Sequence, residues 1–180
     1  MTRTRYEIYI NEQPHFLTMT VFDWIPLFIN PDIVSTILAS MRFVQKERQV
    51  AFYAYVIVEH HLYLIASASE FRKTMKDFKS FTARTIIDYL EGRTAVYLLD
   101  KLRDAKLPHK TKSKYQIWQE GSHPEEIHSE KMFLQKIAYI HNNPVRRGYV
   151  EKPKCRRYSS ARNNEGLEGL IEVKTDWRNQ

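Results

Sequence analysis

The chain has 180 residues, of which 43% are hydrophobic and 27% are charged, proportions typical of a globular protein and unlike those of a disordered one. Its 28 basic and 21 acidic residues give a formal net charge of +7, which favours an anionic partner, most commonly nucleic acid. Cys155 is the only cysteine, so a disulfide within the chain is excluded and a reducing, cytoplasmic setting is expected. No apolar run approaches the ~20 residues that span a membrane, and residues 1–9 contain no hydrophobic signal core.

The N-terminal part of the chain predicts a strand followed by a helix. Residues 15–22 are rich in β-formers. Asn30 is a favourable capping residue and Pro31 a favourable first helical residue, so a helix is expected from here to about Lys46. Its apolar residues recur at helical spacing: Ile33, Ile37, Met41 and Val44.

Two β-rich runs follow, residues 50–58 and 61–67. Only Glu59 and His60 separate them, and such a short gap predicts an antiparallel hairpin.

A second helix is expected next. Ser67 and Glu70 match the spacing of a capping box, which predicts that this helix opens here and runs to about Glu91. Its inward residues are expected to be Phe71, Met75, Phe78 and Thr82. A basic outer face is formed by Arg72, Lys73, Lys76 and Lys79.

Three elements are predicted in the remaining sequence: a helix over residues 94–106, a short strand over 115–119 and a helix over 129–142. Pro144 disfavours helical geometry at the preceding residue and is expected to end the last helix. From about residue 147 a basic, partly irregular tail completes a single domain over 1–180. The order β-α-β-β-α-(α)-β-α predicts an α+β, ferredoxin-like fold, with helices packed on one face of an antiparallel sheet.

Two segments contain residues suited to chemistry on phosphate. His61 and Tyr63 are two apart on a predicted strand and therefore share a face. Tyr139 and Asn143 are four apart on a predicted helix and therefore lie one turn apart. An imidazole and an amide facing a tyrosine could hold a divalent cation beside a nucleophile. We expect His61 and Tyr139 to lie within ~15 Å of each other if they share a site.

The motif around Tyr139 resembles that of the REP-associated tyrosine transposases, single-tyrosine members of the HUH class. Residues 139–148 read Tyr-Ile-His-Asn-Asn-Pro-Val-Arg-Arg-Gly, which matches the family motif Tyr-Ile-His-x-Asn-Pro-Val-x-x-Gly throughout. Residues 157–161 are similar to the closing segment of the family and residues 118–123 to its middle segment. The resemblance covers roughly residues 15–165.

The histidine motif departs from the family pattern. His61 stands at the first HUH histidine and Leu62 at the hydrophobic position, but Tyr63 stands where the second histidine is expected. A neutral phenol is a poor ligand for Mg²⁺ or Mn²⁺. His60 is expected to project to the opposite face by strand alternation unless a bulge redirects it. Whether Tyr63, His60, His123 or His141 completes the metal site is left open.

The resemblance implies a transposase whose nucleophile is Tyr139, with His61 and Asn143 as retained ligands of a weakly bound Mg²⁺ or Mn²⁺ ion. It implies attack on single-stranded DNA beside a hairpin, a 5′-phosphotyrosine intermediate, no use of ATP, and a monomer or homodimer. Phosphates are expected to contact basic residues in three stretches. These are Lys73, Lys76, Lys110, Lys112, Arg146, Arg147 and Arg157.

Two alternatives remain open. The active transposase is the favoured interpretation, and the alternative is a DNA-binding relative whose catalysis is impaired, because Tyr63 stands where the resemblance implies a ligand. An RNA-binding ferredoxin-like domain is disfavoured because the sequence lacks the aromatic, glycine-containing strand signature of that class.

Overall fold

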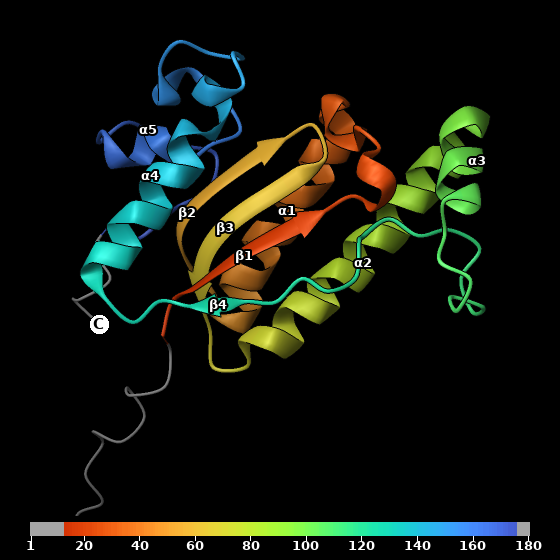
Figure 1. Cartoon of the computed structure of the whole chain (residues 1–180), viewed down its shortest axis with the longest axis horizontal. Coiled ribbons are helices and arrows are strands. Elements are labelled where there is room, and N and C mark those ends of the chain that lie inside the picture. The colour runs from red at the N-terminus through yellow and green to blue at the C-terminus, as the bar shows by residue number, and fades with distance from the viewer. Residues whose placement is uncertain (1–12, 176–180) are drawn as a thin grey trace, which may run out of the picture.

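The computed structural model describes residues 13–175; the segment 1–9 examined for a signal core lies outside them. A four-stranded antiparallel sheet forms the centre, with the strand order β2-β3-β1-β4 (Figure 1). The strands are β1 (His15–Thr20), β2 (Ala51–Val58), β3 (His61–Ser67) and β4 (Glu125–Glu126). Because β3 lies between β1 and β2, this is the split β-α-β arrangement of ferredoxin-like folds, and the predicted α+β class is confirmed.

Helices cover the sheet on both faces, so the expectation of helices on one face is wrong. On one face lie α1 (Pro31–Arg48) and α2 (Phe71–Gly92), while α4 (Glu130–Arg146) packs on the other face against β2 and β3 (Figure 1). A shorter helix, α3 (Val96–Asp104), follows α2. The remaining short helices are η1 (Phe22–Trp24), η2 (Leu27–Ile29), η3 (Pro153–Cys155) and α5 (Ala161–Asn164). Among the described residues no helix is both long and apolar enough to cross a membrane.

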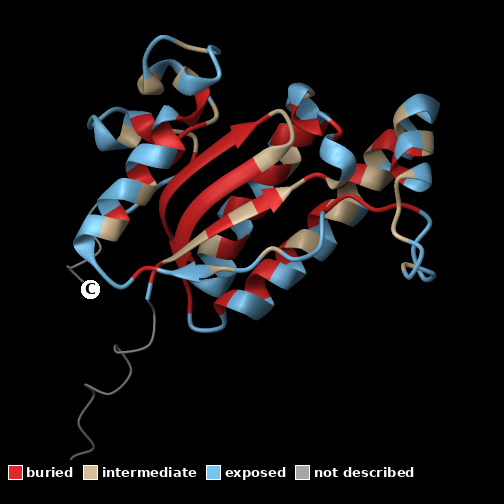
Figure 2. Cartoon of the chain, in the orientation of Figure 1, coloured by how far each residue is buried: buried red, intermediate tan, exposed pale blue. Residues whose placement is uncertain are grey.

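Side-chain alternation along β3 divides the core into two parts. Leu62 and Leu64 pack toward α1 and α2, whereas Tyr63 and Ile65 pack toward α4. Both faces of β2 and β3 are therefore covered, and both strands are almost wholly buried (Figure 2). This explains why β2 reads as a continuous apolar run instead of an alternating one.

The two predicted helix starts differ in outcome. At α1 the Asn30 side chain accepts a hydrogen bond from the backbone N–H of Asp32 at 2.9 Å, as expected of a cap. The prediction of a capping box at α2 is wrong. Ser67 belongs to β3, where its hydroxyl lies 3.1 Å from that of Tyr53, and Glu70 caps the helix without a side-chain hydrogen bond.

The strand predicted over residues 115–119 is not regular. Trp118 forms an isolated bridge with Val21, and the Gln119 N–H donates to Thr20 O at 2.8 Å. The indole N–H of Trp118 donates to Thr82 Oγ1 at 3.0 Å and so ties this segment to α2. The segment therefore continues the edge of β1 without forming a ladder, and the fourth strand is β4.

The helix predicted to stop before Pro144 continues to Arg146. It ends in a Schellman motif, in which the N–H of Tyr149 donates to Pro144 O and that of Gly148 to Val145 O, both at 2.9 Å. Gly148 has φ +75°, a conformation that glycine adopts without the steric cost of a Cβ. Asn143 and Pro144 are both buried, so packing outweighs the local effect of proline and keeps Asn143 helical.

The tail beyond residue 147 is irregular but follows β2 closely. The N–H of Ile57 donates to Tyr158 O at 2.9 Å, and the N–H of Ser160 donates to Tyr55 O at 3.0 Å. Further along, Lys174 N–H donates to Phe52 O at 2.8 Å. The edge of β2 is thereby paired along much of its length, which limits its exposure to other chains.

Tyr55 is fully buried in β2, on the face that packs against α1. Burial raises the pKa of its hydroxyl from 10.0 to about 12, and nearby backbone groups of Ile171 and Leu170 offset part of this effect. Between these two pKa values the unfolded chain loses the phenolic proton while the folded chain keeps it. The free energy of unfolding therefore falls as pH rises through this window.

We expect Tyr55→Phe to reduce this alkaline loss. Between pH ~9 and ~11 the free energy of unfolding, measured by urea denaturation, should fall by roughly 1 kcal/mol less in the variant than in the natural chain. Tyr97→Phe is the matched control, because Tyr97 is 72% exposed. Equal alkaline losses in the two variants would contradict the argument.

Candidate nucleic-acid cleavage site

His61, Tyr63 and Tyr139 lie in one contiguous group on the α4 side of the sheet. The rings of His61 and Tyr63 stack with centroids 5.3 Å apart and planes 8° apart. Tyr63 meets Tyr139 edge-on, with centroids 5.8 Å apart and an angle of 81°. These two steps keep His61 and Tyr139 within the ~15 Å expected of residues that share a site.

The Tyr139 side chain packs against its neighbours and remains partly exposed. Its ring meets the edge of Phe16 at 6.0 Å, and the Arg146 guanidinium lies 5.9 Å from its centroid. The residue is 39% exposed, unlike Asn143 one turn further along α4, which is 7% exposed. Tyr139 is therefore accessible to a large substrate, while Asn143 lies beneath it.

The Tyr63 ring lies between the rings of His61 and Tyr139. Burial raises the pKa of its hydroxyl, and the neighbouring Tyr139 raises it further, while Arg147 and a hydrogen bond with Asn143 act in the opposite direction. Tyr63 is consequently a neutral phenol at neutral pH. Its position matches the sequence expectation that it would face the same side as His61.

The His61 side chain is also neutral at neutral pH, because burial disfavours its charged form. Burial, then the charges of His60 and Arg147, lower its pKa to about 4, against a smaller opposing effect of Glu59. A neutral imidazole keeps a lone pair that can bind a metal ion.

Two buried atoms at this position lack hydrogen-bond partners within residues 13–175: Nδ1 of His61 and Oδ1 of Asn143. Unpaired buried polar atoms are costly, and these two are of the nitrogen and oxygen types that Mg²⁺ or Mn²⁺ can accept as ligands. In the part of the chain that the structure describes, no group of three or more His, Cys, Asp or Glu side chains gathers around a metal position. By the chemistry of these atoms, His61 and Asn143 are the described residues that would hold a divalent cation here.

The expectation for His60 is wrong. Strand alternation places it opposite His61, but His60 belongs to the turn before β3, and its ring centroid lies 4.4 Å from that of His61. Its Nδ1 is 3.8 Å from a carboxylate oxygen of Glu59, which also pairs with Arg147 at 3.3 Å. A residue in a turn does not obey the period of the following strand.

The other two candidate ligands, His123 and His141, lie elsewhere in the structure. His141 is buried with its Nε2 2.8 Å from Ser160 Oγ, and burial lowers its pKa to about 4. Ser160 in turn accepts the backbone N–H of Tyr55 at 2.9 Å, so His141 anchors the tail to β2. His123 lines a groove beside α2.

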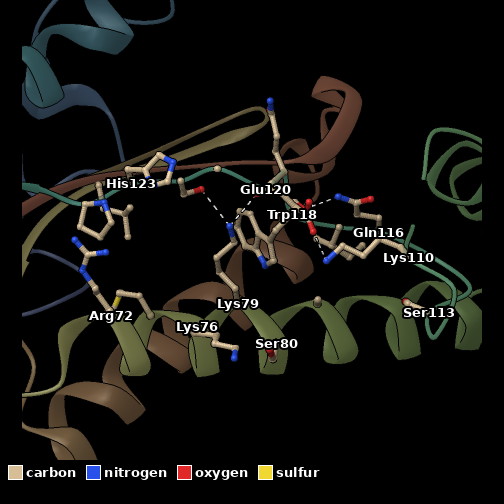
Figure 3. A pocket seen from close by; sticks show the side chains of 18 of the residues that line it. Arg72, Lys76, Lys79, Ser80, Lys110, Ser113, Gln116, Trp118, Glu120 and His123 are labelled. Carbon is tan, nitrogen blue, oxygen red and sulfur yellow. Dashed lines mark hydrogen bonds and ion pairs between the residues drawn. The ribbon is translucent and has the colours of Figure 1, made fainter. Parts of the chain in front are cut away.

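This groove, of about 650 Å³, runs between α2 and residues 110–124 (Figure 3). Lys79 crosses it and donates to Gln119 O at 2.9 Å and Ser122 Oγ at 3.1 Å. Burial lowers the pKa of Lys79. Arg72 and Lys76 line the wall formed by α2, and Lys110 pairs with Glu120 on the opposite wall.

The predicted DNA-binding residues do not line a single pocket. Lys76 and Lys110 line the groove, whereas Lys73 pairs with Glu70 at 3.1 Å, and Lys112 lines a second hollow on α2. Arg146 and Arg147 lie at the end of α4 near Tyr139 and His61. Arg157 lines a hollow with Cys155 and Arg162.

Two residues at this site were not expected from the sequence: Phe16 and Trp24. Phe16 touches Tyr139, and Trp24 lies against both His60 and His61, with ring centroids 5.6 and 6.1 Å away. Phe16 could have been found from period-2 alternation on β1, because its side chain faces the same side as Thr18, the partner of Tyr63. Trp24 carries no comparable local signal.

Comparison with known proteins finds solved structures with a similar fold. No protein-family model and no curated protein sequence matches the chain. A solved structure of a REP-associated tyrosine transposase bound to a REP hairpin is similar, with a TM-score of 0.65, 16% identity, and 98% of this chain and 94% of that chain covered. A protein designated a candidate transposase from Deinococcus radiodurans R1 matches with a TM-score of 0.45 and 16% identity over 79% of this chain and 97% of that one. The chain therefore has the fold of a REP-associated tyrosine transposase.

Proposed function

We propose that this protein cleaves and rejoins single-stranded DNA next to a hairpin, through a 5′-phosphotyrosine intermediate formed by Tyr139. One observation carries the proposal. A half-exposed tyrosine lies beside a neutral histidine and a buried asparagine, of which the last two each present a buried atom without a hydrogen-bond partner among the described residues. The similar transposase structure, which contains a REP hairpin, supports DNA as the partner.

The reaction uses the accessibility of Tyr139. Its hydroxyl oxygen attacks the phosphorus of a phosphodiester, and the bond from phosphorus to the 3′-oxygen breaks. The phenolic proton leaves to solvent, and the departing 3′-oxygen takes up a proton. The energy of the phosphodiester is kept in the covalent link, so a free 3′-hydroxyl can reverse the step at a new junction without ATP.

His61 and Asn143 are the residues that would hold a divalent cation, through the His61 ring nitrogen and the Asn143 amide oxygen. When bound, Mg²⁺ or Mn²⁺ would neutralise charge on the phosphate under attack. Arg146 and Arg147, at the same end of α4, add positive charge close to Tyr139 and His61. The groove beside α2 offers a separate basic surface for the DNA backbone.

A second function has specific support: DNA binding without chemistry. Tyr63 occupies the position of a second ligand, and its neutral phenol binds divalent cations weakly.

DNA binding should weaken steeply with salt. Affinity for a hairpin with single-stranded flanks should fall at least ~10-fold between ~50 and ~200 mM salt, because cations released from the phosphates drive association. Lys76→Ala should make the slope of log affinity against log salt shallower by about one. Lys46→Ala on α1 is the control, because the Lys46 side chain is 85% exposed and remote from the groove. Binding that is insensitive to salt would contradict both functions.

Tyr139→Phe should abolish the covalent protein–DNA adduct, reducing its yield at least ~100-fold, because only the nucleophilic oxygen is removed. The adduct is measured by denaturing gel electrophoresis with labelled hairpin DNA and Mn²⁺. Tyr149→Phe is the matched control, since Tyr149 is 42% exposed and lies just beyond α4. Equal adduct in Tyr139→Phe and the natural protein would rule out the proposed nucleophile.

Tyr63→His should increase adduct formation at low Mn²⁺, with roughly 10-fold tighter metal binding, because the new imidazole faces the same side as His61. Tyr63→Phe removes the hydroxyl without adding a ligand and should give no increase. The readouts are Mn²⁺ affinity by calorimetry and adduct yield. If Tyr63→His binds DNA and Mn²⁺ normally yet forms no adduct, the non-catalytic function is favoured.

A further inference from the structure

Trp24 is a large aromatic residue left unusually open beside the candidate site. It is 66% exposed, although burying an indole ring normally contributes strongly to folding. One side of the ring lies on His60, with centroids 5.6 Å and planes 28° apart, and its neighbour His61 meets it at 6.1 Å and 67°. The indole ring is therefore packed against His60 on one side, and most of the residue is open to solvent.

The backbone here is strained. Asp23 and Trp24 have φ values of 53° and 56°, a left-handed conformation that costs a non-glycine residue of order 1 kcal/mol. Neighbouring hydrogen bonds fix this geometry. Trp24 N–H donates to Val21 O at 3.1 Å, and Val21 N–H donates to His60 O at 2.8 Å. The fold therefore holds Trp24, the last residue of η1, beside His61 at the start of β3 without burying it.

The surroundings combine an aromatic face with a cation. The Arg147 guanidinium pairs with a carboxylate oxygen of Glu59 at 3.3 Å, and the same oxygen lies 3.8 Å from Nδ1 of His60. Contacts lead from Trp24 through His61 and Tyr63 to Tyr139. An aromatic ring beside a basic group is the arrangement by which proteins bind single-stranded nucleic acid, with a base stacked on the ring.

We propose that Trp24 is a stacking platform for an unpaired nucleobase in the single-stranded DNA that flanks the phosphodiester attacked by Tyr139. The inference rests on the proposed function, which it extends by assigning a base-binding position. The base, the indole and the His60 imidazole form a continuous stack. Because every nucleobase has a π-face, the platform accepts any base and requires only that it be unpaired.

The test uses 2-aminopurine, whose fluorescence is quenched by stacking, placed in turn at each position of the single-stranded flank of a DNA hairpin. Tyr139→Phe protein is the background, so that covalent chemistry does not intervene. We expect quenching at one or two adjacent positions, lost in Trp24→Ala and partly kept in Trp24→Phe. Affinity for the flanked hairpin should fall roughly 10-fold in Trp24→Ala with an unchanged salt slope, because stacking releases no counterions.

Phe43→Ala is the matched control, since Phe43 is an exposed aromatic, at 60%, on α1 away from the site. It should change neither quenching nor affinity. Thermal unfolding of each variant establishes that the fold is retained, and Trp24→Phe serves if Trp24→Ala unfolds.

Quenching that persists unchanged in a folded Trp24→Ala variant overturns the platform. So does a change in oligomeric state without a change in quenching, which would make Trp24 a protein-contact residue. Both results leave the proposed function standing, because it depends on the Tyr139 adduct. Conversely, absence of the adduct with normal quenching removes the cleavage reaction and keeps the base-binding position.

Discussion

Helix α4 is held against β2 and β3 by Phe133, Ile137 and Ile140, which pack with Val56 and Ile65 in the smaller of the two core clusters. The arrangement of the candidate site depends on this contact. Tyr139 directly precedes the buried Ile140. Packing of α4 on the sheet therefore also fixes the position of the Tyr139 ring, which lies at the edge of the α4–sheet interface. Since Asn143 follows one turn later, the same packing places its amide below Tyr139. Loss of this contact would separate the strand-borne and helix-borne halves of the site.

Tyr63, at the position where the family resemblance leads one to expect a histidine, also orders its neighbours. A phenol is larger than an imidazole and extends its oxygen further, and here it meets both Tyr139 and Asn143. It also stacks flat on His61 at 8°, which restricts rotation of that ring. The contacts among His61, Tyr63, Tyr139 and Asn143 therefore order these side chains without any bound ion.

The regular parts of the fold could be predicted from the sequence because they depend on local periods. Alternation placed His61 and Tyr63 on one side of a strand, and helical spacing identified the buried residues of α1 and α2. Features set by distant contacts could not be found in this way. Pro144 stays helical because its surroundings bury it, and His60 turns beside His61 because it precedes the strand.

The sequence also could not reveal Trp24 or the groove. The left-handed backbone at Trp24 depends on a hydrogen bond from Val21 to His60, residues that are far apart in the sequence. The groove needs α2 and residues 110–124 to face each other across Lys79. Only the tertiary structure brings such partners together, whereas the basic character of each wall was visible beforehand.

The groove and Tyr139 lie on opposite sides of one segment, residues 119–123. These residues line the groove beside α2 and also a hollow that contains Phe16, which touches Tyr139. A ligand that reaches both places must therefore pass around this segment. Bending an uninterrupted duplex sharply costs free energy, on the order of 1–6 kcal/mol for 40–90° over 20–30 bp, which disfavours it as a ligand here. A duplex with a flexible single-stranded extension meets this requirement, because its paired part can lie on the basic groove while its unpaired part turns toward Tyr139. This geometry favours a flanked hairpin over an uninterrupted duplex as the substrate of the proposed reaction.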